Sequence, residues 1–286
     1  MTLREALQKG SAQLLHGTVR TLNPRLDAET LLLHSLGRPG DRAYLLTHQD
    51  LELPPDAQQH FELSLAQRAS GKPVQYITGT QEFWGLEFHV SPAVLIPRPE
   101  TEHLVQEALR IVRQHSWRAP RILDVGTGSG CIAIALAHEL PYAAITAVDL
   151  SPDALAVART NAASLGANVS FLPGDLLDPV HNRQFEIIVS NPPYIATSEA
   201  DAVQPQVRDH EPSTALWAGS DGLTIYRRLI PQARRHLTND GSLLLEIGWG
   251  MEPRIRPLFD PSLWSPLTVI NDLQDIPRVL IAGSRE

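Results

Sequence analysis

Four consecutive residues, Asn191 to Tyr194 with the sequence NPPY, combine hydrogen-bond acceptors with an aromatic ring directly after a run of β-branched residues. Neither proline has an N–H group, so this stretch of backbone presents carbonyl oxygens. The side-chain oxygen of Asn191 and the carbonyl of Pro192 could accept both hydrogens of a planar amino group, and the ring of Tyr194 could stack on its plane. The stretch predicts a site for an NH2 group conjugated to a carbonyl or an aromatic ring, with a plain Pro-Pro turn as the structural alternative.

A glycine-rich loop, DVGTGSG over residues 124–130, is the second feature that could bind a ligand. Its glycines let the backbone turn tightly and let a ligand lie against it, where a side chain would collide. A dinucleotide-binding fingerprint would need a further glycine at position 131, and this chain has Cys131 there. The loop therefore predicts a nucleoside-type ligand.

An acidic residue, Asp149, follows Gly130 by 19 residues, at the end of the next apolar run. A carboxylate in this place can accept hydrogen bonds from the two vicinal hydroxyls of a ribose. Asp175 ends the third apolar run in the same way, and Leu176 beside it could pack on a flat base, with a solvated turn as the alternative.

Short apolar strands alternate with amphipathic helices after residue 120, which is typical of parallel strands joined by right-handed crossovers. We expect a doubly wound, Rossmann-like α/β sheet, mostly parallel, with an antiparallel edge formed by residues 266–284. Such sheets bind ligands at the carboxyl ends of their strands, where the loop and NPPY both fall. The strands are expected at residues 121–125, 144–150, 169–174, 185–191 and 242–248.

Three segments are expected along the chain. Residues 1–73 have helical patterning divided by prolines and predict a small helical domain for substrate recognition. Residues 74–98 are β-rich and predict a hairpin connector that turns at Gly85. The sheet domain then occupies residues 99–286, and Thr101 could cap its first helix.

Composition excludes several classes of protein. The formal net charge of −8 lacks the positive excess of a non-specific nucleic-acid binder. A single cysteine excludes an internal disulfide, and neither it nor the eleven histidines show metal-ligand spacing, so no metal is expected. No apolar run approaches the length of a membrane span, and a cytoplasmic protein is expected.

The loop, Asp149 and NPPY together resemble S-adenosylmethionine-dependent methyltransferases that modify amino nitrogens. Residues 71–105 and 210–230 closely resemble the release factor glutamine methyltransferases, the PrmC or HemK family, and the resemblance extends over nearly the whole chain. It implies methyl transfer from S-adenosyl-L-methionine to the side-chain amide nitrogen (N5) of the glutamine in the Gly-Gly-Gln loop of peptide chain release factors, which would modulate translation termination.

The same resemblance implies the roles of individual residues. Asn191, Pro192 and Tyr194 would be catalytic, and with Pro193 they would hold the glutamine amide. Leu176 departs from the family pattern, which can have an aromatic residue there. The cofactor would be bound by Gly126, Thr127, Gly128, Ser129, Gly130, Asp149, Leu176 and Asn191.

Four other residues each have more than one interpretation. Arg98 and Glu100 could organise the cofactor pocket or form an ion pair between domains. Phe83 and Trp84 could contact the pocket or the substrate loop, or belong to an inter-domain core. NPPY contains no histidine or carboxylate, so no dedicated general base is expected. The nearest candidates, His210 and Glu211, are expected to lie in a solvated turn.

Two rival functions use the same motifs. An adenine methyltransferase would stack a flipped base on Tyr194, but the net acidity and the lack of a base-reading insertion argue against nucleic acid as substrate. A non-catalytic module that only binds S-adenosylmethionine is disfavoured because the glycines, Asp149 and NPPY are all intact.

Overall fold

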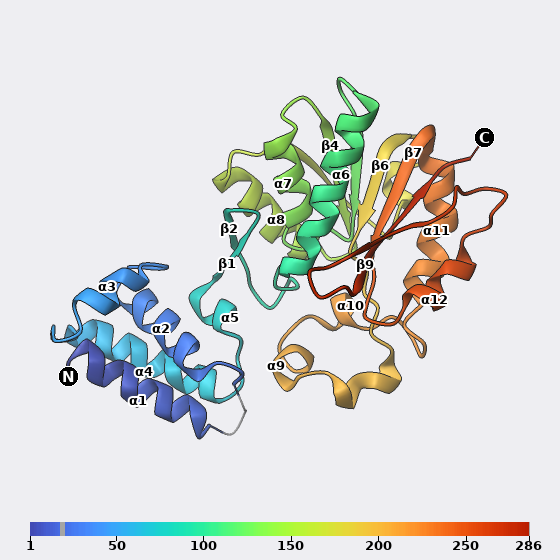
Figure 1. Ribbon diagram of the computed structural model, residues 1–286. Helices are drawn as coiled ribbons and strands as arrows, with labels where there is room; N and C mark the ends of the chain where they lie inside the picture. Colours follow the sequence, from blue (N-terminus) through green and yellow to red (C-terminus); the bar gives the residue numbers. More distant parts are fainter. Residues whose placement is uncertain (18–20, 286) are drawn as a thin grey trace. The chain divides into compact units, whose positions relative to one another are not determined.

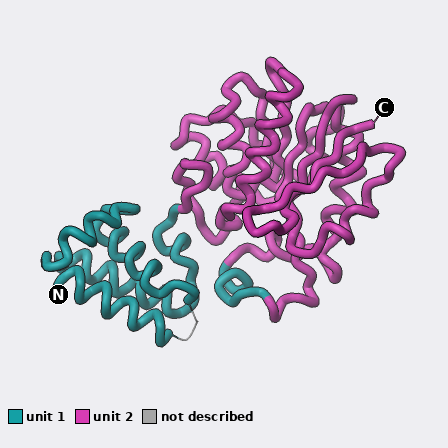
Figure 2. The backbone as a smooth tube through the Cα atoms, viewed as in Figure 1, with its two compact units in different colours: residues 1–80, 203–210 teal, residues 81–202, 211–286 magenta. Residues whose placement is uncertain are grey.

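The computed structural model describes residues 1–17 and 21–285 and consists of two compact units. Unit 1 comprises residues 1–80 and 203–210, and unit 2 comprises residues 81–202 and 211–286 (Figure 2). Residues 18–20 and 286, which the expected ranges 1–73 and 99–286 include, lie outside the described residues. The segment 203–210 belongs to unit 1 although in the chain it lies between two stretches of unit 2.

Unit 1 is helical, as the sequence predicts (Figure 1). Its first helix begins with a capping box, in which Thr2 Oγ1 accepts from the Glu5 N–H at 3.2 Å and Glu5 Oε2 accepts from the Thr2 N–H at 2.9 Å. Gly10 lets this helix approach its neighbour, because a Cβ there would lie 2.8 Å from Phe61 Cζ. The helices are α1 (Leu3–Leu15), α2 (Pro24–Ser35), α3 (Arg42–Thr47), α4 (Pro55–Ala69), α5 (Val74–Thr78) and the short α9 (Pro205–Arg208).

The expected hairpin begins later than the β-rich composition indicates. Residues 74–78 form helix α5, which ends at Gly79 in the left-handed conformation (φ 80°). Strands β1 (Thr80–Phe83) and β2 (Leu86–His89) follow and turn through Trp84 and Gly85, both with positive φ. Tyr76 of α5 is buried and α5 packs against α2 and α4, so tertiary packing overrides the strand propensity of Val74–Thr78.

Unit 2 is built on a seven-stranded sheet in the order β5-β4-β3-β6-β7-β9-β8, which confirms the expected fold class. All neighbouring strands are parallel except that β9 runs antiparallel to β7 and β8. The strand β7 begins five residues earlier than expected, at Leu237. The strands are β3 (Arg121–Val125), β4 (Ala144–Asp149), β5 (Val169–Pro173), β6 (Phe185–Ser190), β7 (Leu237–Glu246), β8 (Thr268–Asn271) and β9 (Pro277–Gly283).

Helices cover both faces of this sheet (Figure 1). Helices α6 (Glu102–His115) and α7 (Cys131–Glu139), with part of α8 (Pro152–Ser164), pack on one face, and α11 (Thr224–His236) and α12 (Glu252–Ile255) pack on the other. Successive strand residues such as Ile187 and Ile188 enter opposite cores, as buried parallel strands require. No described helix is long and apolar enough to cross a membrane. The short elements are η1 (Pro99–Thr101), η2 (Asp178–Val180), η3 (Thr197–Ala202), α10 (Ser213–Leu216) and η4 (Arg256–Leu258).

The strand order reverses direction at β3. The chain runs outward from β3 through β4 to β5 and then returns to β6 on the other side of β3. A crevice forms at such a switch point, outside the carboxyl ends of the strands. The glycine loop follows β3 and NPPY follows β6, so the topology brings both motifs to this point.

Candidate active site

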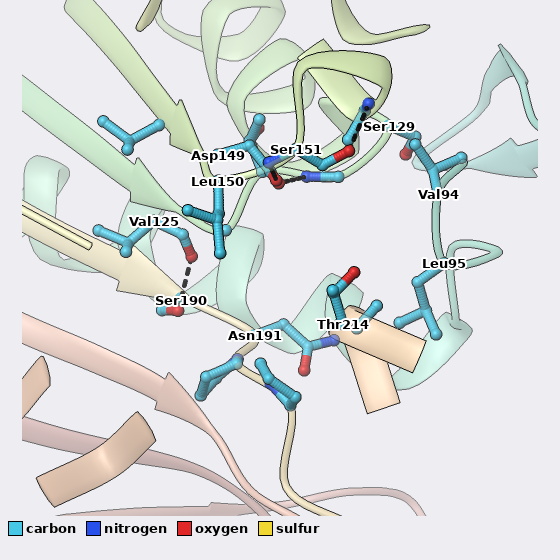
Figure 3. Close-up of a pocket in the computed structure, with 18 of the residues that line it drawn as sticks. Val94, Leu95, Val125, Ser129, Asp149, Leu150, Ser151, Ser190, Asn191 and Thr214 are labelled. Carbon is cyan, nitrogen blue, oxygen red and sulfur yellow. Dashed lines mark hydrogen bonds between the residues drawn. The ribbon is translucent and has the colours of Figure 1, made fainter. Parts of the chain in front are cut away.

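A cavity of about 400 Å³ lies within unit 2 at the carboxyl ends of the central strands (Figure 3). Its volume is in the range typical of small-molecule sites, about 300–1,000 Å³. Val94 and Leu95 lie across it from Val125 (Figure 3). Every residue expected to bind the cofactor except Gly130 lines this cavity: Gly126, Thr127, Gly128, Ser129, Asp149, Leu176 and Asn191.

The glycine loop turns back on the sheet through hydrogen bonds to the next strand. The N–H groups of Gly126 and Thr127 both donate to the Val148 carbonyl, at 2.8 and 3.0 Å. Gly128 has φ 55°, and a Cβ there would meet nothing within 4 Å, so its surface is open for a ligand. Gly130 has a packing role instead, because a Cβ there would lie 3.0 Å from Ile134 and 3.2 Å from the Ala158 Cβ.

The Asp149 carboxylate is held at the end of β4 by backbone donors. Its Oδ2 accepts from the Gly128 N–H and its Oδ1 from the Ser151 N–H, both at 2.8 Å (Figure 3). Burial raises the pKa of this carboxyl, and the bonds from Ser151 and Gly128 lower it. Each oxygen keeps a further acceptor position, so the fixed carboxylate fits the paired hydroxyls of a ribose.

Asp124 lies fully buried just before the glycine loop. Its Oδ2 accepts from the Thr127 hydroxyl at 2.6 Å, whereas Oδ1 has no hydrogen-bond partner among the described residues. Burial raises its pKa to about 7, and the nearby charge of Asp149 adds to this. Thr127 therefore supports the loop through its hydroxyl. The open glycine turn and the fixed carboxylate of Asp149 together fit a cofactor with a ribose.

Leu150 is an apolar residue of the cavity wall that sequence reasoning missed. It directly follows Asp149 and is 64% exposed (Figure 3). The expected Leu176 also lines the cavity. Leu176 has φ 50°, an uncommon conformation for leucine. Both offer flat apolar contact to a base. The position of a leucine directly after the predicted ribose-binding acid is the sequence signal that could have identified Leu150 in advance.

The strand β6 delivers the NPPY segment to the same cavity, where Asn191, Pro192 and Pro193 line the wall. Asn191 Nδ2 donates to Thr101 Oγ1 at 3.1 Å. Its Oδ1 accepts no hydrogen bond from any residue in the described ranges. The Asn191 carboxamide thus has its nitrogen engaged and its oxygen available as an acceptor.

Tyr194 is not among the described residues that line the cavity. It packs against Gly248, where an added Cβ would lie 2.8 Å from the ring. Burial raises the pKa of Tyr194 to about 12, so the phenol stays neutral. Stacking of this ring on a substrate amide stays a prediction.

Arg98 forms its ion pair with Glu211, 2.5 Å away and in the same unit, so the interpretation as an ion pair between domains is wrong. A role of Arg98 in organising the cofactor pocket stays a prediction. Glu211 also accepts from the Ile96 N–H at 3.3 Å, and only 6% of the residue is exposed. The expectation of a solvated turn at Glu211 is therefore wrong, since tertiary contacts bury it. Arg98 lines the cavity, and Glu100 is absent from the lining among the described residues.

Phe83 and Trp84 belong to the core of unit 2. Phe83 is 1% exposed and meets Phe88 edge-on, with ring centroids 6.1 Å apart. Trp84 packs against the same core, and its Nε1 donates to Glu139 at 3.0 Å. Neither ring is among the described residues that line the cavity.

Glu246 at the end of β7 is a further residue that sequence reasoning missed. Only 3% of it is exposed, and its Oε2 lacks a hydrogen-bond partner within residues 1–17 and 21–285. Burial raises its pKa to about 7, while hydrogen bonding from Thr101 and Asn191 lowers it. A buried carboxyl thus lies next to the NPPY segment, at the end of the strand that pairs with β6.

Comparisons with known proteins agree with this architecture. The family described as "Methyltransferase small domain" matches residues 104–209, and the "PrmC N-terminal domain" matches residues 5–79. The crystal structure of a methyltransferase from Pyrococcus furiosus superposes with a TM-score of 0.52 over 77% of this chain and 98% of that chain, at 17% identity, which shows the shared fold. The family match, the shared fold and the cavity at the strand ends together identify the class of this protein as a methyltransferase.

Two curated relatives show which family of methyltransferases this chain belongs to. The release factor glutamine methyltransferase of Koribacter versatilis is 47% identical over 98% of this chain and 98% of its own length. The enzyme of that name from Escherichia coli is 40% identical over 91% of this chain and 92% of its own length. The chain belongs to the release factor glutamine methyltransferase family.

Proposed function

We propose that this enzyme transfers a methyl group from S-adenosyl-L-methionine to the side-chain amide nitrogen of the glutamine in the Gly-Gly-Gln motif of peptide chain release factors, and so modulates translation termination. One observation carries the proposal. The acceptor-rich edge of Asn191 and Pro192 and the glycine loop with Asp149 line a single cavity, in a chain of this family.

The residues of the cavity divide between the two substrates. Gly128, Asp149 and the apolar surfaces of Leu150 and Leu176 would hold the nucleoside part of S-adenosyl-L-methionine, which supplies an electrophilic methyl on a positively charged sulfur. Asn191 and the Pro192 carbonyl would hold the glutamine amide. Their placement on one wall would orient the amide nitrogen toward the methyl group.

An amide nitrogen is a poor nucleophile because its lone pair is delocalised into the carbonyl. Acceptors on both of its N–H groups favour charge development on nitrogen as the new bond forms. The hydrogen bonds from the substrate amide to Asn191 Oδ1 and to the Pro192 carbonyl therefore strengthen in the transition state, which is the condition for a rate effect. This chemistry requires no general base at NPPY, since the proton can leave after methyl transfer.

We further propose that unit 1 recognises the release factor and that the enzyme acts in the cytoplasm. Release factors are large folded proteins that act at ribosomes, and a separate helical unit offers contact surface beyond the glutamine loop. The net charge of −8 supports a protein substrate over a nucleic acid.

The test is transfer of radiolabelled methyl from S-adenosyl-L-methionine to a purified, unmethylated release factor. Its Gln→Ala loop variant serves as the substrate control. Asn191→Ala should lower kcat about 100-fold, by analogy with the loss of one oxyanion-hole group. The exposed Asn168→Ala is the matched enzyme control.

Label that requires both the substrate glutamine and Asn191 supports the proposal. Label on nucleic acid and none on the release factor would move the function to adenine methylation. Cofactor binding without transfer to any acceptor would indicate a non-catalytic module.

A further inference from the structure

Thr101 precedes helix α6 at the position where a threonine hydroxyl ordinarily accepts a hydrogen bond from the first turn. Within the described chain, this hydroxyl bonds no N–H group of α6. It accepts instead from Asn191 Nδ2 at 3.1 Å, across 90 residues of sequence. Only 2% of Thr101 is exposed, so water does not compete for this bond. The expected helix cap is thus engaged with the NPPY segment.

Glu246 completes a group of three side chains from three different elements. It ends β7, the strand beside β6, and its carboxyl is almost fully buried. Burial raises its pKa, hydrogen bonding from Thr101 is the strongest influence that lowers it, and hydrogen bonding from Asn191 also lowers it. Of the charged groups around it, Glu100 raises the pKa and Arg278 lowers it. The strand register pairs Ser190 with Leu245, so Glu246, the last residue of β7, lies directly beside Asn191, and its buried Oε2 has no hydrogen-bond partner among the described residues. Thr101 and Asn191 thus bring the hydroxyl and the NH2 group nearest to this acceptor.

A hydrogen bond from the Thr101 hydroxyl to this acceptor would determine which way the Asn191 carboxamide faces. A hydroxyl has one hydrogen, and a Thr101 hydroxyl that donates to Glu246 has only lone pairs left for Asn191. Asn191 must then present its NH2 group to Thr101 and Glu246 and its oxygen to the cavity. Without the pair, a carboxamide rotated by half a turn would fit equally well and would place NH2 against the NH2 of the substrate.

We propose that Thr101 and Glu246 are positioning residues for methyl transfer, which lock the Asn191 carboxamide with its oxygen toward the acceptor amide. The inference rests on the proposed function, because the acceptor must bring N–H hydrogens to that oxygen. A locked acceptor has no reorientation to complete as charge develops on the substrate nitrogen. The pair therefore acts on kcat through Asn191 and leaves cofactor binding unaffected.

The experiment compares Thr101→Val, Thr101→Ser and Glu246→Leu with wild type in transfer of labelled methyl to a release factor. The exposed Thr268→Val on edge strand β8 is the matched control. Thr101→Val should lower kcat by about tenfold or more, as for the loss of one buried hydrogen bond, with KM for the release factor and Kd for S-adenosyl-L-methionine within about twofold of wild type. Thr101→Ser keeps the hydroxyl and should retain most of the activity.

A double-mutant cycle separates positioning from structure. In an Asn191→Ala background, Thr101→Val should cause no further loss of kcat, because Asn191 carries its effect. Three outcomes would each overturn the proposal. They are a wild-type kcat in Thr101→Val, a kcat in Thr101→Ser as low as in Thr101→Val, and losses of kcat that multiply when Thr101→Val and Asn191→Ala are combined. Should Thr101→Val not fold, Glu246→Leu is judged by the same kcat loss and the same cycle. Wild-type enzyme without transfer to any release factor would instead refute the proposed function itself, and this inference with it.

Discussion

Arg98 Nη2 and Glu211 Oε1 lie 2.5 Å apart although 113 residues separate them in sequence. Arg98 belongs to the segment before α6, and Glu211 begins the segment that carries Pro212 and Thr214. Both segments line the cavity. The ion pair therefore ties together two walls of the candidate active site.

Loss of this ion pair should loosen both walls. Glu211→Gln keeps an acceptor for the Ile96 N–H but leaves Arg98 without its counter-charge. Because the Arg98 side chain is 35% exposed, we expect a loss of about 2 kcal/mol, below that of a fully buried pair, and a lower Tm. Thermal unfolding and titration with S-adenosyl-L-methionine measure the effect, and weaker cofactor binding should accompany it. The exposed Glu199→Gln is the control, and equal behaviour of the two variants would contradict the role of the pair.

Asp149→Ala should weaken cofactor binding by about 10–100-fold, the range expected when a buried partner of a hydrogen-bonded group is removed. The variant removes the acceptor for the ribose and also releases the Gly128 N–H of the loop. Calorimetric titration with S-adenosyl-L-methionine measures the Kd. Asp153→Ala, exposed in the first turn of α8, should bind like wild type. An unchanged Kd in Asp149→Ala would exclude this carboxylate from the cofactor site.

Gly248→Ala tests the placement of Tyr194. The new methyl group would lie 2.8 Å from the Tyr194 ring and 3.0 Å from Met251 Sδ, so the ring must move. Overpacking of this kind costs about 1–3 kcal/mol of unfolding free energy. We also expect a lower kcat with little change in cofactor Kd, because Tyr194 belongs to NPPY and is not among the described residues that line the cavity. The neighbouring Trp249→Ala, at a residue 78% exposed, should leave both unchanged.

Glu246 should make stability depend on pH in a defined direction. Its folded-state pKa of about 7 lies above the ordinary value of 4.5, so the folded protein binds the proton more tightly than the unfolded chain. This contribution is fully present below about pH 4.5 and is lost as pH rises through 7, so it lowers the free energy of unfolding over that window. Glu246→Gln lacks this titration.

Urea unfolding at pH 5 and pH 8 measures the effect. The free energy of unfolding of Glu246→Gln relative to wild type should increase by a few kcal/mol between these values, on the order of 1.4 kcal/mol per unit of pKa shift. The buried Asp124 titrates in both proteins and cancels in the difference. A difference that is constant with pH would show that Glu246 titrates normally.

The sequence alone determined the sheet, the glycine loop and NPPY, and the placement of both motifs at the same edge of the sheet. Apolar strands alternating with helices predict a parallel sheet, and the carboxyl ends of its strands share one edge. The glycine loop, Asp149 and Asn191 all lie at strand ends, so their convergence follows from topology without knowledge of any side-chain contact. Such motifs are readable in the sequence because their residue types and spacing stand within a few consecutive positions.

Tertiary structure decided what each neighbouring polar residue does. Thr101 is a plausible helix cap by local rules, and Glu211 a plausible surface residue, yet one bonds Asn191 and the other is buried against Arg98. Val74–Thr78 is a helix despite its β-branched residues. Glu246 looks like any strand residue until β6, β9 and α6 enclose it. Burial and partners separated by 90 residues or more arise only when the chain has folded, and no pattern within a short window records them.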